Sequence, residues 1–373
     1  MSKQLENLTS KFEALRAKGI GQILLEGRAV FALVIIILIF ASLSPNYLTV
    51  DNVLIMTKHV AINGLLAIGM LLVILKGGID LSVGSIVALS GVVAGFLMRG
   101  VEIPGTDVVA YMPLWAVVLV ALGVGSLAGY INGVLVTRFN VAPFIATLGM
   151  LYIARGTALL ISDGKTFPKL QGDPELGNTG FRILGQDTFL GVAPGVWFMV
   201  LVAIFTSILL TRTAFGRRLY AVGGNERAAA LGGVQVDKIK RTVYMFSGFT
   251  AGLTGIVLAS ELTAATPQTG ETFELNAIAA VVIGGAALSG GRGTIRGTIL
   301  GAFVIGFLAD GLVIIGVSEF WKMVIKGAVI ILAVAIDQAQ QRTKVSKKKT
   351  EKTLKSPKPP EMSNGKIPFD RHK

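Results

Sequence analysis

Residues 60–98 decide the class of this protein, with the sequence VAINGLLAIGMLLVILKGGIDLSVGSIVALSGVVAGFLM. Two apolar runs, 60–75 and 81–98, are separated only by the five residues KGGID. A transmembrane helix needs about 20 mostly apolar residues, so each run approaches the length of a membrane span. The whole 373-residue chain shares this character, because 52% of it is hydrophobic, only 15% is charged and its mean hydropathy is +0.68. This composition excludes an ordinary soluble enzyme.

Ten stretches of the chain qualify as membrane spans by length and hydropathy, so we expect an all-α polytopic membrane protein. They are 29–43, 60–75, 81–98, 112–131, 141–161, 193–211, 242–260, 277–289, 295–318 and 320–337. The positive-inside rule places loop 212–241, which holds seven Lys and Arg, in the cytoplasm together with both termini. The chain then divides into a cytoplasmic N-terminal segment (1–28), a transmembrane domain (29–337) and a basic cytoplasmic tail (338–373), which we expect to be disordered.

Glycine spacing predicts how the spans pack. Four pairs of glycines stand one helical turn apart inside spans, a spacing that lets two helices approach closely, and we expect them to pack within the bundle. The pairs are Gly91 and Gly95, Gly125 and Gly129, Gly248 and Gly252, and Gly297 and Gly301. A possible internal repeat relates the second and third spans to the eighth and ninth, since GG-x5-GSI at 77–86 resembles GG-x5-GTI at 290–299.

The residue inventory excludes several kinds of chemistry. There is no cysteine, and His59 and His372 are the two histidines, so we expect no metal site, no cofactor and no catalytic residue in this chain. Gly164-Lys165-Thr166 imitates the end of a nucleotide-binding loop, but Leu159 stands where its first glycine should be. The net charge of +13 is concentrated at the chain ends and in one loop, so we expect no nucleic acid as a partner.

Ionisable residues within spans are expensive and mark sites that need an explanation. Asp80 opens the third span after two glycines, where we prefer a structural cap on the following helix to a contact with substrate. Asp310 and Lys326 lie at similar depths in the last two spans, so we expect a neutralising ion pair, with a proton or cation path as the alternative.

Polar and aromatic side chains in or near the spans are candidates for lining a translocation path for a hydroxylated substrate. Each of them could equally bridge two helices or, for the aromatic one, lie at the membrane interface. The candidates are Asn63, Asp80, Ser85, Asn140, Phe144, Thr147 and Asn276.

The basic loop 212–241 contains a predicted short helix. Asn225 is a good N-cap for a helix over 226–231, which Gly232 and Gly233 would end. A short surface helix of this kind suits docking into a groove of a partner, although an ordinary charged loop remains the alternative.

Four separated blocks resemble the permease subunits of ribose-type monosaccharide ABC importers, and together they extend over about 50–337. The blocks are GM-x5-KGGIDLSVGS at 69–85, PFIATLG at 143–149, AVGGN-x2-AA at 221–229 and AIAAVVIGG at 277–285. The resemblance implies a ten-helix permease of the bacterial inner membrane. It would work with a second permease copy or a sister permease, an ABC ATPase dimer that binds ATP and Mg²⁺, and a periplasmic or lipid-anchored sugar-binding protein.

The resemblance also assigns a coupling region that contacts the ATPase. Its residues are Gly223, Gly224, Asn225, Glu226, Ala228, Ala229 and Gly232. The implied substrate is a ribose-class pentose, a hexose or a related polyol; a nucleoside or a furanone signal is the alternative within this class, and an ion-coupled secondary transporter is the alternative outside it. The basic tail and the long outer loop 162–192 depart from the family pattern.

Overall fold

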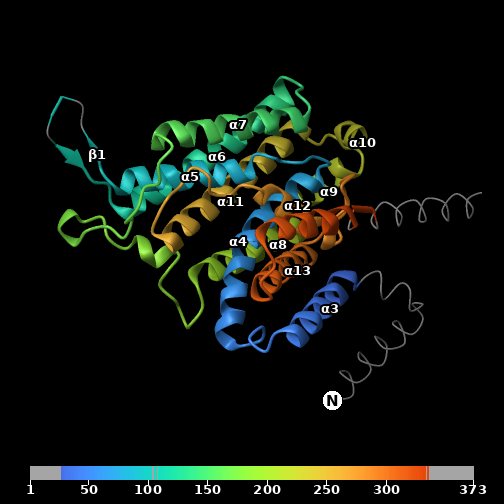
Figure 1. The fold of residues 1–373 in the computed structure, drawn as a ribbon. Helices are drawn as coiled ribbons and strands as arrows, with labels where there is room; N and C mark the ends of the chain where they lie inside the picture. The colour runs from blue at the N-terminus through green and yellow to red at the C-terminus, as the bar shows by residue number, and fades with distance from the viewer. Residues whose placement is uncertain (1–26, 103–104, 107, 333, 336–373) are drawn as a thin grey trace, which may run out of the picture.

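The computed structural model describes residues 27–102, 105–106, 108–332 and 334–335, and most of this part of the chain is helical (Figure 1). Six of its helices are long and apolar enough to cross a membrane: α4 (Val50–Leu75), α6 (Leu114–Arg138), α7 (Pro143–Ser162), α8 (Pro194–Arg212), α11 (Val236–Leu262) and α13 (Ile295–Ile314). Three shorter apolar helices accompany them: α3 (Arg28–Leu43), α5 (Val83–Met98) and α12 (Phe273–Ile283). This is the architecture of a polytopic membrane protein.

The remaining elements lie in the connections. The strands β1 (Val101–Glu102) and β2 (Val109–Ala110) form an antiparallel hairpin, and two 3₁₀ turns, η1 (Pro174–Leu176) and η2 (Phe181–Leu184), lie in the loop between α7 and α8. Between α8 and α11 come α9 (Ala214–Gly224) and α10 (Glu226–Leu231). Residues 319–332 are also helical.

The bundle is organised around α11, which packs against α4, α5 and α6. Helices α4 and α5 are buried over most of their length, whereas α3 and α8 present large apolar side chains outward, including Leu38 and Leu201. Apolar side chains that are exposed along a membrane helix face lipid at no cost, so the buried positions mark the protein interior. Among the described residues, most buried polar side chains lie on α5, α6 and α11 and in the link between α4 and α5.

Backbone contact between glycines sets the spacing of α6 and α11. A Cβ atom added to Gly248 would lie 2.1 Å from the carbonyl oxygen of Gly125, and one added to Gly129 would lie 2.2 Å from that of Tyr244. The other glycine pairs also pack internally, Gly91 against Gly255 and Gly301 against Ala280. The prediction that these pairs serve packing within the bundle is confirmed.

The two ends of the bundle collect different loops. At one end the Gly291 amide donates to the Leu75 carbonyl at 2.8 Å, and Arg241 Nε donates to Thr137 Oγ1 at 2.7 Å. At the other end, Asn178 Nδ2 donates to the Met98 carbonyl, and Lys58 pairs with Glu261 at 3.1 Å. Figure 1 shows α9 and α10 at the first end and the β1 hairpin at the opposite one. We call these the basic end and the hairpin end.

Several predicted boundaries differ from the observed ones. The second span was expected from residue 60, but α4 begins ten residues earlier, at Val50. The eighth was expected over 277–289, whereas α12 covers Phe273–Ile283 and stops because Gly285 adopts φ +94°. The two copies of the glycine repeat lie against each other, since Gly290 approaches the Gly77 amide, but the repeat itself stays a prediction. The expectations for 1–26 and for the tail 338–373 lie outside the described residues.

Candidate functional site

A buried polar network occupies the non-helical link between α4 and α5. Asp80 is fully buried, and its Oδ1 accepts hydrogen bonds from the Ser82 backbone N–H at 3.0 Å and from Ser82 Oγ at 2.6 Å. Its Oδ2 accepts from Ser247 Oγ of α11 at 2.9 Å, while Asn132 Nδ2 of α6 donates to Ser82 Oγ. Asp80 therefore holds Ser82, the N-cap of α5, in place and ties the link to two neighbouring helices.

Lys76 stands at the other end of the same link, directly after α4. Its side chain is buried, its Nζ donates to Tyr244 Oη at 2.9 Å, and it lies 4.0 Å from the centre of the Tyr244 ring. Lys76 and Asp80 thus bracket a link that turns through Gly77, which has φ +82°. Non-helical backbone at membrane depth survives only where protein or water satisfies it. Here Asp80 accepts from the Ser82 N–H and Ser85 Oγ donates to the Ser82 carbonyl, while side chains of α6 and α11 hold the side chains of the link.

The structure divides the seven sequence candidates for the path. Asp80 and Ser85 are buried in the network, and Thr147 Oγ1 donates to the Pro143 carbonyl of its own helix at 2.9 Å. These contacts agree with the expected structural role of Asp80. Its carboxylate, however, accepts a hydrogen bond from the N–H of Ser82, the N-cap residue, rather than from an amide of the first turn of α5. Asn140 and Phe144 are exposed around the start of α7, Asn63 Nδ2 donates to the His59 carbonyl, and Asn276 is half-buried on α12. The seven residues do not form one cluster.

The expected ion pair between Asp310 and Lys326 is wrong. Asp310 Oδ1 contacts His59 Nδ1 of α4 at 2.9 Å, and in the described part of the chain no ion pair joins Asp310 to Lys326. The reason is tertiary, because α13 packs against α4 and turns Asp310 toward it. Equal depth in consecutive spans gives no information on which helix face meets which neighbour.

A second non-helical segment, 263–272, was missed by the sequence reading. Arg155 of α7 donates through Nη1 to the carbonyl of Thr269 at 2.8 Å and to that of Pro267. Arg155 lies within the predicted span 141–161, and a cation inside a span is a sequence signal that could have identified this residue. Glu271 and Glu274 carry the negative charges that act on it electrostatically.

The basic end carries the predicted short helix. Helix α10 covers Glu226–Leu231, as predicted, and Asn225 Oδ1 accepts from the Ala228 N–H at 3.0 Å, which confirms the N-cap. Ala228 is exposed whereas Ala229 is buried, and Glu226 Oε1 contacts Lys240 Nζ at 2.7 Å. Leu231 is 91% exposed, which is unusual for a leucine outside the apolar faces and which the sequence reading did not single out.

Helix α9 connects this surface rigidly to the interior. A Cβ added to Gly223 would lie 1.7 Å from the Leu75 carbonyl oxygen and 2.6 Å from the Gly291 nitrogen. Tyr220 Oη donates to the Gly293 carbonyl at 2.8 Å, and burial raises the pKa of this phenol, so it stays a neutral donor. Gly223 is therefore an internal contact, and α9 touches both the end of α4 and the link between α12 and α13.

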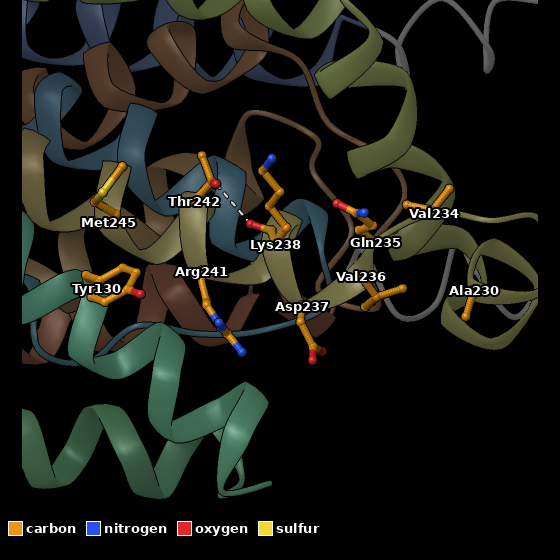
Figure 2. Close-up of a pocket in the computed structure, with 10 residues that line it drawn as sticks. All are labelled: Tyr130, Ala230, Val234, Gln235, Val236, Asp237, Lys238, Arg241, Thr242 and Met245. Atoms are coloured by element: carbon orange, nitrogen blue, oxygen red, sulfur yellow. Dashed lines mark hydrogen bonds between the residues drawn. The ribbon is translucent and has the colours of Figure 1, made fainter.

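A groove of about 660 Å³ lies beside α10 at the basic end (Figure 2). It is lined from three elements, by Tyr130 of α6, by Ala230 of α10 and by residues of α11 that include Lys238 and Arg241. Thr242 Oγ1 donates to the Lys238 carbonyl at 2.9 Å, and Figure 2 shows Arg241 and Asp237 pointing to the same side of α11. The groove enlarges the surface that α10 offers to a partner.

Interrupted helices, buried polar links and an exposed helix joined to those links define this chain as a membrane transport permease. Residues 52–334 match the family described as branched-chain amino acid transport system / permease component, and the chain belongs to this family. It is 43% identical to the ribose import permease protein RbsC of Bacillus subtilis (strain 168), over 89% of this chain and 98% of that protein. It is 41% identical to the protein of the same name from Escherichia coli (strain K12), over 85% and 95% of the two chains.

A further relative is the D-allose transport system permease protein AlsC of Escherichia coli (strain K12), which is 38% identical over 83% of this chain and 90% of that protein. No solved structure matches the chain significantly. The chain is accordingly a multi-pass permease of the inner membrane, and it is a transport component of an ABC importer rather than an enzyme.

Proposed function

We propose that this chain is the membrane subunit through which an ATP-driven importer moves a monosaccharide into the cytoplasm. The observation that carries the proposal is the similarity over almost the whole chain to permeases named for ribose, and at lower identity to others named for arabinose, allose and xylose. A ribose-class pentose is the first substrate to test, followed by hexoses and polyols. The permease moves its cargo by alternating access, in which rigid groups of helices rock about the central path.

The partners that this function needs lie outside the chain. An ABC ATPase dimer binds ATP and Mg²⁺ at the basic end, a periplasmic or lipid-anchored binding protein delivers the sugar at the hairpin end, and a second copy or a sister permease completes the path. Supporting this orientation, the exposed cations of loop 212–241 gather at the basic end; they are Arg212, Arg217, Arg218, Arg227 and Lys238. Cytoplasmic loops are the ones enriched in such cations.

Coupling to the ATPase is proposed to run through α10 and α9. Asn225, Ala228 and Leu231 offer the exposed surface, and Gly224 and Gly232 flank it without close neighbours that a Cβ would strike. Ala229 and Gly223 lie behind this surface, so a displacement of α10 acts on the Leu75 carbonyl through Gly223. Because packed backbone transmits strain, the α4–α5 and α12–α13 links move with it.

The test is purification of the chain in mild detergent together with its partners, followed by an ATPase assay with binding proteins loaded with single sugars. We expect an ABC ATPase to co-purify and one loaded binding protein to stimulate hydrolysis. A panel that includes ribose, arabinose, allose, xylose, a nucleoside and a furanone identifies the substrate class. A chain that binds no ATPase, or a complex that responds only to the nucleoside or the furanone, would contradict the proposal.

A further inference from the structure

The segment 263–272 runs from the hairpin end down to the middle of the bundle. Near its start, Ala265 lies against Gly95, close to the end of α5. Near its end, a Cβ added to Gly84 would lie 2.2 Å from the Gly270 carbonyl oxygen. Gly84 stands 14 residues before Met98, the last residue of α5, which at 1.5 Å per residue is about 21 Å. Five residues of extended chain span about 17 Å, so 265–270 descends alongside α5 into the hydrocarbon zone.

Arg155 holds this segment at that depth. It stands seven residues before the end of α7, about 10 Å inside the helix end, where an arginine is costly unless it finds acceptors. A non-helical segment has carbonyls without helical partners, and the guanidinium takes two of them, those of Pro267 and Thr269. The guanidinium and the carbonyls thus satisfy each other, because an unpaired carbonyl in hydrocarbon also carries a large free-energy cost.

The outward side of this segment is polar although it lies at membrane depth. Gln268, Glu271 and Thr272 are exposed, and Glu274 and Asn276 are half-buried on the first turn of α12. Charged and amide side chains do not face lipid in this zone, and neither does irregular backbone. The outward side of 268–272 must therefore face water or protein in the assembled transporter, in contrast to α8, whose exposed side chains are apolar.

We propose that Gln268, Glu271 and Thr272 form a contact surface for a neutral polyhydroxylated substrate inside the translocation path, with Arg155 as the residue that positions it. The inference rests on the proposed function and names the site within it. The carboxylate of Glu271 accepts hydrogen bonds from sugar hydroxyls, and the amide of Gln268 and the hydroxyl of Thr272 can both donate and accept them. Asn276, one helical turn after Thr272, is a sequence candidate that adjoins this surface.

The absence of cysteine in the natural sequence makes the test direct. Gln268→Cys, Glu271→Cys and Thr272→Cys are placed singly in the transporter, which is reconstituted with its ATPase, and are exposed to a membrane-impermeant cationic thiosulfonate. The matched control is Leu201→Cys, because Leu201 is 62% exposed among the outward apolar side chains of α8. We expect the three variants to react and the control to stay unmodified, with the sugar-loaded binding protein plus ATP changing the reaction rates. Labelling no faster than at Leu201→Cys would overturn the inference.

Transport kinetics separate contact from positioning. Glu271→Gln should raise the KM for uptake about tenfold, the factor expected for losing a charge-assisted hydrogen bond, with ATPase association unchanged. Arg155→Met should abolish the change in labelling at Glu271→Cys on addition of sugar, and Arg155→Lys should restore part of it. An unchanged KM in Glu271→Gln, or an unchanged labelling response in Arg155→Met, would contradict the assignment.

Failure of the proposed function has a different signature. In that case no monosaccharide-loaded binding protein would stimulate ATP hydrolysis by the wild-type complex, regardless of how fast the cysteines at positions 268, 271 and 272 react with the thiosulfonate. If instead the wild-type complex imports a sugar while the three cysteines stay inert, the function stands and only this surface is wrong.

Discussion

At the scale of single residues, the buried polar groups of this permease hold its non-helical links in shape. Asp80 accepts three hydrogen bonds from two serines, and Arg155 serves two carbonyls of the segment 263–272. Hydrocarbon offers these groups no water as a hydrogen-bond partner, so each must be satisfied by protein or by a water-filled path. The same side chains on the surface of a soluble protein would contribute little.

Asp80→Ala should destabilise the protein strongly. The substitution leaves the Ser82 N–H and the hydroxyls of Ser82 and Ser247 without their acceptor, a loss of about 3 kcal/mol. Thermal unfolding in detergent measures the effect as a lowered Tm. The matched control is Asp163→Ala, since Asp163 is an exposed aspartate on the loop after α7 whose pKa is lowered by its hydrogen bond to Lys165. Equal Tm values for the two variants would show that the Asp80 network is not structural.

At the scale of elements, the helices fall into two groups by what they pack against. Helix α11 meets α4 and α5 along buried faces, so these three form the interior, and α6 packs on α11 through glycines. Five of the six residues of α10 are exposed, and the helix is held by its cap, by the buried Ala229 and by the Glu226–Lys240 pair. The interior helices determine stability, whereas α10 is free to serve a partner.

Gly248→Leu should prevent correct assembly of the bundle. The new side chain would meet the Gly125 carbonyl and the Gly129 backbone, which cannot move aside as a flexible side chain would. We expect a loss of more than about 3 kcal/mol and little monodisperse protein in size-exclusion chromatography. Gly123→Leu on α6 is the control, because nothing lies within 4 Å of the position that its Cβ would occupy. A well-behaved Gly248→Leu protein would argue against this contact.

Leu231→Asp should weaken binding of the ATPase while leaving the Tm unchanged. Burial of a leucine in a partner groove stabilises a complex by about 1.5–3 kcal/mol, so the dissociation constant should rise about tenfold or more. Leu190→Asp provides the matched control, because Leu190 is 78% exposed in the loop between α7 and α8, on the hairpin side. Binding of the purified ATPase to immobilised permease gives both constants. If both variants bind equally well, α10 is not the docking element.

At the scale of the whole molecule, the positions of the basic loops and the contacts between loops are consistent with one orientation in the membrane. The loops that the positive-inside rule assigns to the cytoplasm meet at the basic end, where Leu75 contacts Gly291 and Arg241 contacts Thr137. The loop 163–193 meets α5 and α11 at the other end, through the bonds of Asn178 and Phe181. A single orientation in the membrane therefore satisfies all of these loops.

Single-cysteine variants test this orientation without a background reaction. Glu175→Cys in the loop between α7 and α8 should react with an impermeant maleimide in intact spheroplasts, and Arg227→Cys on α10 should react only in inverted vesicles. Both side chains are exposed, so access to the reagent depends on the side of the membrane. The reverse pattern would invert the topology and would remove α10 from contact with a cytoplasmic ATPase.

Much of the architecture could be predicted from local pattern. Apolar runs located the spans, glycine spacing identified the close helix contacts, and Asn225 with Gly232 and Gly233 bounded α10 correctly. Errors arose where a helix ends before its apolar run does, as at Ile283, because the run continues across the break at Gly284 and Gly285. The path candidates do not form one cluster, because a polar residue in a span has the same sequence signature whether it binds a neighbouring helix or faces a cavity.

The sequence by itself determined the membrane class and the family and predicts the sidedness, because hydropathy, motif and charge are properties of adjacent residues. Only the tertiary structure decided which polar groups meet: Asp310 with His59 rather than Lys326, Asp80 with Ser247, and Arg155 with the carbonyls of Pro267 and Thr269. These partners are separated by up to 251 residues in the chain. Their meeting depends on which faces of the helices pack together, and in a bilayer that packing is set by shape and hydrogen bonding between helices rather than by hydrophobicity.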